Sequence, residues 1–92
     1  MHIMIVAYKM KLYGKVQGVG FRFFLSKHAE RLGIKGYAKN LEDGSLECWF
    51  EGEEEKVKEI IEIAKKGPPL ARVKKFEIKE ENPKRFETFE TY

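Results

Sequence analysis

Residues 14–22 read GKVQGVGFR and join an apolar, strand-like segment to an amphipathic, helix-like one. Closely spaced glycines allow a tight turn because they carry no Cβ atom. Successive N–H groups of such a turn can point into one concavity, and the start of the following helix adds positive potential there. Arg22 adds a planar guanidinium that is always charged. The stretch therefore predicts an anion site of the size of one phosphoryl group.

Two common phosphate-binding loops do not match this stretch. The spacing Gly18-x-Gly20 is that of the dinucleotide fingerprint G-x-G-x-x-G, but Phe23 stands at the third glycine position. No G-K-[ST] ends the loop, so it is not a Walker A loop. The simplest alternative is a tight strand-to-helix turn with a surface arginine, but the nine-residue string is far more specific than a glycine turn.

Hydrophobic periodicity on either side of the loop predicts alternating strands and helices. We expect strands over residues 5–13, 34–41, 46–51 and 72–79, helices over 21–32 and 53–66, and a short edge strand after Pro83. Asp43-Gly44 is a strong hairpin signal between the second and third strands. Val73 and Phe76 differ in parity along the last long strand, which predicts a bulge there.

The order β-α-β-β-α-β predicts an α+β fold, a ferredoxin-like sandwich with two helices packed on one face of an antiparallel sheet. We expect a single domain over residues 1–92, because a chain of this length builds one small core.

Composition limits the possible chemistry. The single cysteine, Cys48, excludes an internal disulfide and a four-thiolate metal site, and no His/Cys/Asp cluster has metal-ligand spacing, so we expect no metal and no cofactor. The apolar stretch over residues 1–8 is too short to span a bilayer and lacks a basic region and a cleavage site, which favours a cytoplasmic protein. Lysine and glutamate dominate the charges and aspartate occurs once, a profile that fits a thermophilic source.

The string in residues 14–22 resembles the acylphosphatase signature G-x-V-Q-G-V-G-F-R. The second half of the pattern follows, since GYAKN over residues 36–40 resembles the family's G-x-[VA]-x-N strand end and residues 43–45 resemble its D-G-[ST] turn. The resemblance covers roughly residues 5–80 and is closest to stand-alone, archaeal-type members. It implies the same β-α-β-β-α-β fold and the hydrolysis of acyl phosphates to a carboxylate and inorganic phosphate.

The resemblance also implies roles for particular residues. Arg22 and Asn40 would be catalytic, with Arg22 holding the phosphoryl group and Asn40 positioning the attacking water. The backbone N–H groups of the loop would bind the phosphoryl oxygens, from Gln17, Gly18, Val19, Gly20 and Phe21. The partners expected are a small acyl phosphate and, as product and competitive inhibitor, inorganic phosphate. We expect a monomer with no nucleic-acid or membrane partner.

The hydrolysis of an acyl phosphate is compatible with a site that consists only of an arginine, an asparagine and backbone amides. The leaving group is a carboxylate, which departs without being protonated, so the enzyme needs anion binding and an in-line water rather than a strong general acid. We expect structural roles for the other reactive or aromatic residues. These are His28 beside the apolar stripe of the first helix, Cys48 in the core, and Tyr13, Tyr37 and Trp49 on the sheet surface.

Other functions fit the same element order. RNA-recognition domains share it, and a pI of about 9.0 with Trp49-Phe50 on the third strand favours comparison with them. That strand lacks the basic-glycine-aromatic pattern of such domains and carries Glu47 and Glu51 instead. A metallochaperone of this architecture would need a C-x-x-C, which is missing. A third alternative is a domain that only binds a carbamoyl or acyl phosphate within a larger maturation enzyme.

Overall fold

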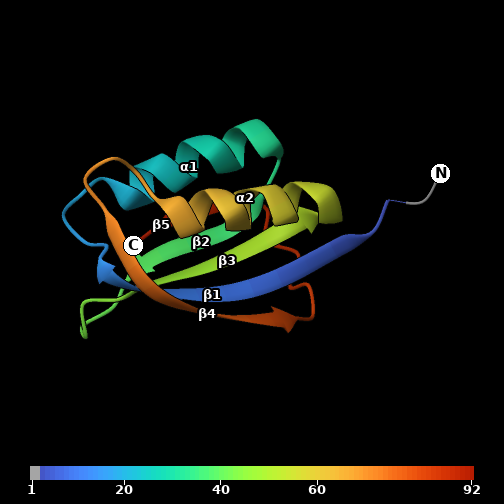
Figure 1. The fold of residues 1–92 in the computed structure, drawn as a ribbon. Coiled ribbons are helices and arrows are strands. Elements are labelled where there is room, and N and C mark those ends of the chain that lie inside the picture. The colour runs from blue at the N-terminus through green and yellow to red at the C-terminus, as the bar shows by residue number, and fades with distance from the viewer. Residues whose placement is uncertain (1–2) are drawn as a thin grey trace.

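The computed structural model describes residues 3–92 and consists of a five-stranded sheet with both helices on one face (Figure 1). The elements follow in the order β1 (Ile5–Lys15), α1 (Phe21–Leu32), β2 (Lys35–Asn40), β3 (Leu46–Glu53), α2 (Glu54–Lys66), β4 (Arg72–Glu81) and β5 (Phe89–Thr91). The predicted β-α-β-β-α-β order is confirmed, as is the short strand after Pro83. Within residues 3–92, no helix is long and apolar enough to cross a membrane.

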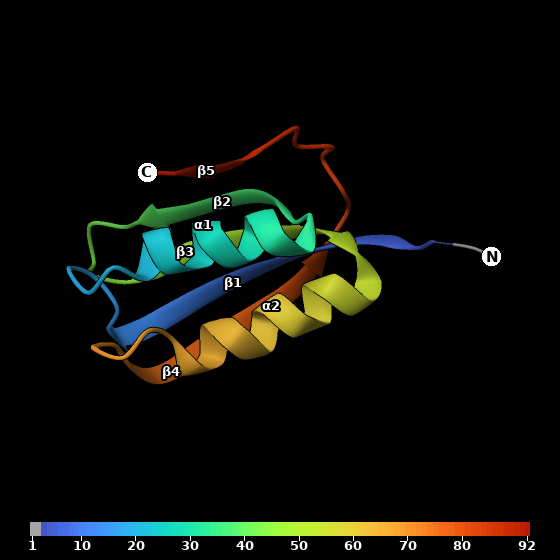
Figure 2. The ribbon, with the colours of Figure 1, turned by 90° about the horizontal axis from the view of Figure 1, so that it is seen from above.

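The strand order in the sheet is β4-β1-β3-β2-β5. The four long strands pair antiparallel, as predicted, whereas β5 pairs parallel with β2 and so makes the sheet mixed at one edge. The segment between β4 and β5 passes from one edge of the sheet to the other near the end where β4 finishes (Figure 2). The chain therefore returns antiparallel to β4, which is the direction of β2.

Strand alternation and helical periodicity place the core between the sheet and the helices. β1 contributes Met10 and Leu12 to this layer, and both are fully buried. The predicted helix stripes are buried as well: Phe21, Leu25, Ala29 and Leu32 of α1, and Val57, Ile60, Ile61 and Ala64 of α2. Cys48 is a fully buried free thiol, as expected, and burial raises the pKa of that thiol.

The predicted bulge is present in β4. Tyr13 pairs with Lys75 but the next residue, Gly14, pairs with Val73, so the register shifts at Lys74. Gly14 has a φ of 124°, and a Cβ there would lie 2.2 Å from the Arg72 carbonyl oxygen, so only glycine allows this close approach. After the shift β1 stays paired with β4 through Lys15, the last strand residue before the glycine loop.

The outer face of the sheet is covered in part by the segment that follows β4. Trp49 points away from the helices yet is only 1% exposed, because Phe86 packs against its ring with centroids 5.7 Å apart. Lys84 Nζ lies 4.7 Å from the centroid of the same indole ring. Trp49 therefore packs on the sheet surface, as predicted, and is not available to stack on a base.

Candidate active site

The glycine loop between β1 and α1 adopts a conformation that favours glycine. Gly18 and Gly20 have φ angles of 72° and 77°, in the left-handed region that other residues rarely adopt. A Cβ atom at either position would meet nothing within 4 Å, so the requirement is for backbone conformation and not for space. Gly20 is also the N-cap of α1, which begins at Phe21 as predicted.

The Gln17 side chain ties this loop to the turn between β2 and β3. Its Nε2 donates hydrogen bonds to the carbonyl oxygens of Leu41 at 2.8 Å and Ser45 at 2.9 Å. Asp43 stabilises the turn in its own right, by accepting a hydrogen bond from the Ser45 amide at 2.9 Å. Gln17 therefore fixes the position of the loop relative to the end of β2, a role that the sequence pattern alone did not predict.

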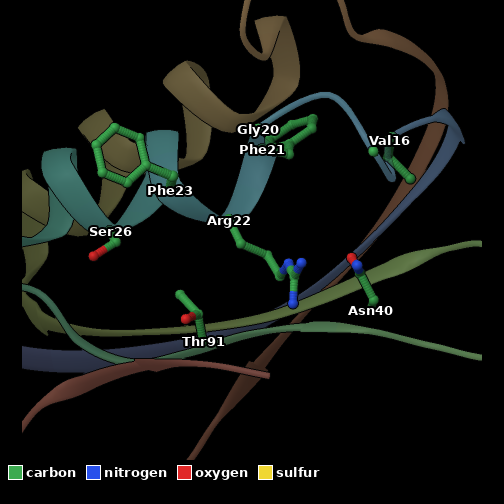
Figure 3. A pocket seen from close by; sticks show the side chains of 9 residues that line it. Val16, Gly20, Phe21, Arg22, Phe23, Ser26, Asn40 and Thr91 are labelled. Atoms are coloured by element: carbon green, nitrogen blue, oxygen red, sulfur yellow. The ribbon is translucent and has the colours of Figure 1, made fainter.

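The loop, the first turn of α1 and the ends of β2 and β5 enclose a pocket of about 310 Å³. Its lining is shown in Figure 3 and consists of Val16, Gly18, Gly20, Phe21, Arg22, Phe23, Ser26, Asn40 and Thr91. The structure thus brings together five of the predicted site residues, Gly18, Gly20, Phe21, Arg22 and Asn40. Gln17 and Val19 do not line the pocket, because the Gln17 side chain bonds to the neighbouring turn and Val19 packs in the core.

The N-terminus of α1 is left open to an anion. The first α-helical hydrogen bond runs from the Phe24 amide to the Gly20 carbonyl oxygen, at 3.0 Å, so the preceding amides have no partner within the helix. No side chain caps this end and its first turn carries no acidic residue, whereas α2 has Glu54 and Glu55 there. The positive end of the α1 dipole therefore faces the pocket without a compensating charge.

Arg22 adds a full positive charge to the same place. Its guanidinium points into the pocket between Asn40 and Thr91 (Figure 3). None of the hydrogen bonds or ion pairs between residues 3 and 92 involves this guanidinium. A planar donor fork with no protein acceptor is suited to bind a phosphoryl group through paired hydrogen bonds.

Asn40 ends β2 on the side of the sheet that faces α1. Its backbone amide donates to the Tyr92 carbonyl oxygen at 3.0 Å, which joins the end of β2 to the chain just beyond β5. Its side-chain Oδ1 is buried and accepts no hydrogen bond from the described part of the chain. An unsatisfied buried acceptor is destabilising by about 1–3 kcal/mol, so this oxygen is suited to accept a hydrogen bond from a water or ligand in the pocket.

Four pocket residues were missed by sequence reasoning: Val16, Phe23, Ser26 and Thr91. Ser26 follows Arg22 by four residues on α1, a spacing that places both side chains on one helix face and could have indicated it. Thr91 carries no comparable signal, since its place depends on the parallel pairing of β5 with β2. Among the described residues, no three His, Cys, Asp or Glu side chains are grouped so as to hold a metal ion.

His28 packs as a structural residue, in agreement with the sequence prediction. Its ring lies edge-on to Phe24 with centroids 4.8 Å apart, and its Nδ1 is 2.8 Å from Nη2 of Arg31. The imidazole does not line the pocket. It therefore has no place in a mechanism that acts on a bound phosphoryl group.

Comparison with known proteins agrees with this fold and site. Residues 8–91 match the acylphosphatase family. An acylphosphatase of Thermococcus kodakarensis is 48% identical over 80 residues, which cover 87% of this chain and 88% of that protein. One of Archaeoglobus fulgidus is 43% identical over 86 residues, or 94% of this chain and 97% of that protein. The crystal structure of a Bacillus subtilis acylphosphatase superposes with a TM-score of 0.91 at 31% identity, covering 97% of this chain and 99% of the other.

A larger protein contains a similar unit. Full-length HypF, solved in a phosphate- and nucleotide-bound form, matches all of this chain with a TM-score of 0.92 and 30% identity, but the match covers 12% of HypF. The family match spans nearly the whole length described here, with the loop and Asn40 inside it. The chain therefore belongs to the acylphosphatase family, and it is an enzyme that hydrolyses acyl phosphates.

Proposed function

We propose that the loop amides of residues 17–21 and the Arg22 guanidinium bind the phosphoryl group, while Asn40 positions the water that attacks it. The observation that carries this proposal is the buried Oδ1 of Asn40, which accepts no hydrogen bond from residues 3–92 and faces the same pocket as Arg22. Acceptance by Oδ1 of a hydrogen bond from water would orient that water's lone pair toward the phosphorus. For Gln17 and Val19 the proposal concerns only their backbone N–H groups.

The reaction is an in-line displacement at phosphorus. The water oxygen forms a bond to phosphorus as the bond to the acyl oxygen breaks, and the acyl group leaves as a carboxylate. Charge that spreads over the phosphoryl oxygens is stabilised by Arg22 and by the uncapped start of α1. The water proton passes to a phosphoryl oxygen of the substrate, because no carboxylate or imidazole lines the pocket. The products are a carboxylate and inorganic phosphate.

The remaining properties follow the sequence expectations. We propose a monomer, because the apolar faces of the sheet and of both helices are buried against one another within the chain. The free, buried Cys48 and the Lys- and Glu-rich composition favour the cytoplasm of a thermophilic organism. No nucleic-acid partner is proposed, since the Trp49 ring is covered by Phe86 and Lys84.

The test is the inhibition of benzoyl phosphate hydrolysis by inorganic phosphate. Because phosphate is the product and would occupy the loop–Arg22 site, we expect competitive inhibition and no binding of single-stranded RNA at matched concentrations. A purely non-competitive pattern would place phosphate elsewhere. RNA binding that phosphate does not displace would show a second ligand class on a different surface.

A further inference from the structure

Part of the pocket takes no part in phosphoryl binding or in positioning water. This part is formed by Phe23, Ser26 and Thr91, which line the same pocket as Arg22 and Asn40. Phe23 is 67% exposed, so its ring is accessible to a molecule bound in the pocket. Its ring is placed beside Lys27, whose Nζ lies 5.6 Å from the ring centroid.

The direction of the reaction places the acyl group on that side. In an in-line displacement the leaving oxygen departs opposite the attacking water. Figure 3 shows Asn40 on one side of the Arg22 guanidinium, and Phe23, Ser26 and Thr91 on the other. A water held by Asn40 therefore sends the carboxylate toward Phe23, and the group attached to that carboxylate passes along the helix surface.

We propose that Phe23, Ser26 and Thr91 form the subsite for the acyl group, and that the Phe23 ring gives the enzyme a preference for flat, apolar acyl groups. An aromatic acyl group can pack against the exposed ring, whereas the methyl group of acetyl phosphate offers little contact area. The hydroxyl groups of Ser26 and Thr91 provide hydrogen-bond donors for the acyl carbonyl oxygen. This inference rests on the proposed function, because it uses the position of the water at Asn40.

The experiment compares kcat/KM for benzoyl phosphate with kcat/KM for acetyl phosphate in the wild type and in Phe23→Ala. We expect the ratio of the two to fall by about 3- to 10-fold in Phe23→Ala, in line with the size of one aromatic contact. Phe23→Leu keeps an apolar side chain without the ring, so its ratio should lie between those of the wild type and Phe23→Ala. Ile3→Ala is the matched control, because Ile3 is 66% exposed and precedes the opposite end of β1. Its ratio should equal that of the wild type.

Two results would overturn the inference. An unchanged ratio in Phe23→Ala would show that the ring does not contact the acyl group. An equal fall for both substrates would show that Phe23 acts on the phosphoryl site or on the fold. Failure of the proposed function would give a different result. In that case Asn40→Ala would keep its kcat on both substrates, whatever the ratio of kcat/KM values measured in Phe23→Ala.

Discussion

Two polar side chains on neighbouring strands, Glu51 on β3 and Asn40 on β2, have opposite surroundings. The Glu51 carboxylate is on the outer face of the sheet and the residue is only 4% exposed. It accepts hydrogen bonds from Trp49 Nε1 at 2.9 Å and from the backbone amides of Lys84 and Arg85 at 2.9 and 2.8 Å. The buried Oδ1 of Asn40, on the helix side, accepts none from the described residues.

The satisfied carboxylate explains how the chain crosses the sheet. Two successive amides converge on Glu51, and Arg85 takes a φ of 63° at this point, unusual for a residue other than glycine. The charge-assisted bonds stabilise this conformation and fix the segment that leads to β5. Because β5 then places Thr91 at the pocket, Glu51 supports the site from the other face of the sheet without touching it.

The comparison separates polar groups that hold the fold from polar groups that serve the ligand. Glu51 and Gln17, which hold parts of the fold together, have their hydrogen-bond partners within the chain. Asn40 Oδ1 and the Arg22 guanidinium face the pocket without a partner among residues 3–92. Their removal should therefore affect activity and leave stability intact, whereas removal of Glu51 should do the reverse.

The largest effect is expected at Arg22. Arg22→Ala should lower kcat/KM by at least on the order of 10³, since it removes a charged donor pair from the phosphoryl group. Arg22→Lys should be nearly as damaging, because lysine keeps the charge and loses the planar fork. Steady-state kinetics with benzoyl phosphate, beside a melting curve, checks both variants. Near-normal kinetics in the lysine variant would mean that charge alone suffices.

The next effect is the loss of stability in Glu51→Ala. The buried Trp49 Nε1 donor and the two part-buried amides of Lys84 and Arg85 would lose their acceptor, which should lower the free energy of unfolding by about 2–3 kcal/mol. For a domain of this size that corresponds to a fall in Tm of roughly 10–20 °C. Glu51→Gln keeps one acceptor oxygen and should lose less. The folded Glu51→Ala protein should retain most of its kcat, and a loss of turnover without a loss of Tm would reverse the comparison.

The smallest expected effect is a pH-dependent change in stability at Asp43, in the turn whose carbonyl oxygens accept hydrogen bonds from the Gln17 side chain. Hydrogen bonds from Ser45, together with Lys11 at 3.2 Å, lower the pKa of Asp43 to about 2 from its usual 3.8. A lowered carboxyl pKa stabilises the fold above the unfolded pKa, and that contribution disappears as the pH falls through the folded pKa. Asp43→Asn should therefore melt below the wild type at pH 5 and above, and the difference should shrink below about pH 4 and vanish as the pH falls through about 2. An undiminished difference at pH 2 would show that charge is not its source.

The region around Asn40 could be predicted from the sequence to a larger extent than the region around Glu51. The glycine loop, the start of α1 and the end of β2 follow from local signals, namely the glycines, the apolar stripe of α1 and the Asp43-Gly44 turn. The parallel pairing of β5 could not be predicted in the same way. It depends on Glu51 binding the amides of residues more than thirty positions later, and a contact of that range leaves no local pattern. Thr91 was missed at the pocket for the same reason.

The burial of Trp49 is a second feature that depends on a segment distant in the sequence. Strand alternation places Trp49 on the outer face of the sheet, whereas Cys48 and Phe50 face the core, and that prediction is confirmed. Its burial to 1% comes from Phe86, which lies beyond β4 in the sequence. Alternation alone would predict a half-exposed ring, as on any one-sided sheet.

The most direct test of the account is Asn40→Ala, measured for three quantities: kcat with benzoyl phosphate, the inhibition constant of inorganic phosphate, and Tm. We predict a fall in kcat on the order of 10²–10³, since the variant loses the group that orients the water. The inhibition constant should stay near the wild-type value, because Arg22 and the loop amides still bind phosphate. Tm should change by no more than about 4–8 °C in either direction, the shift for roughly 1 kcal/mol in a domain of this size. An unchanged kcat with a collapse of phosphate affinity would make Asn40 a phosphate ligand and would contradict the proposed mechanism.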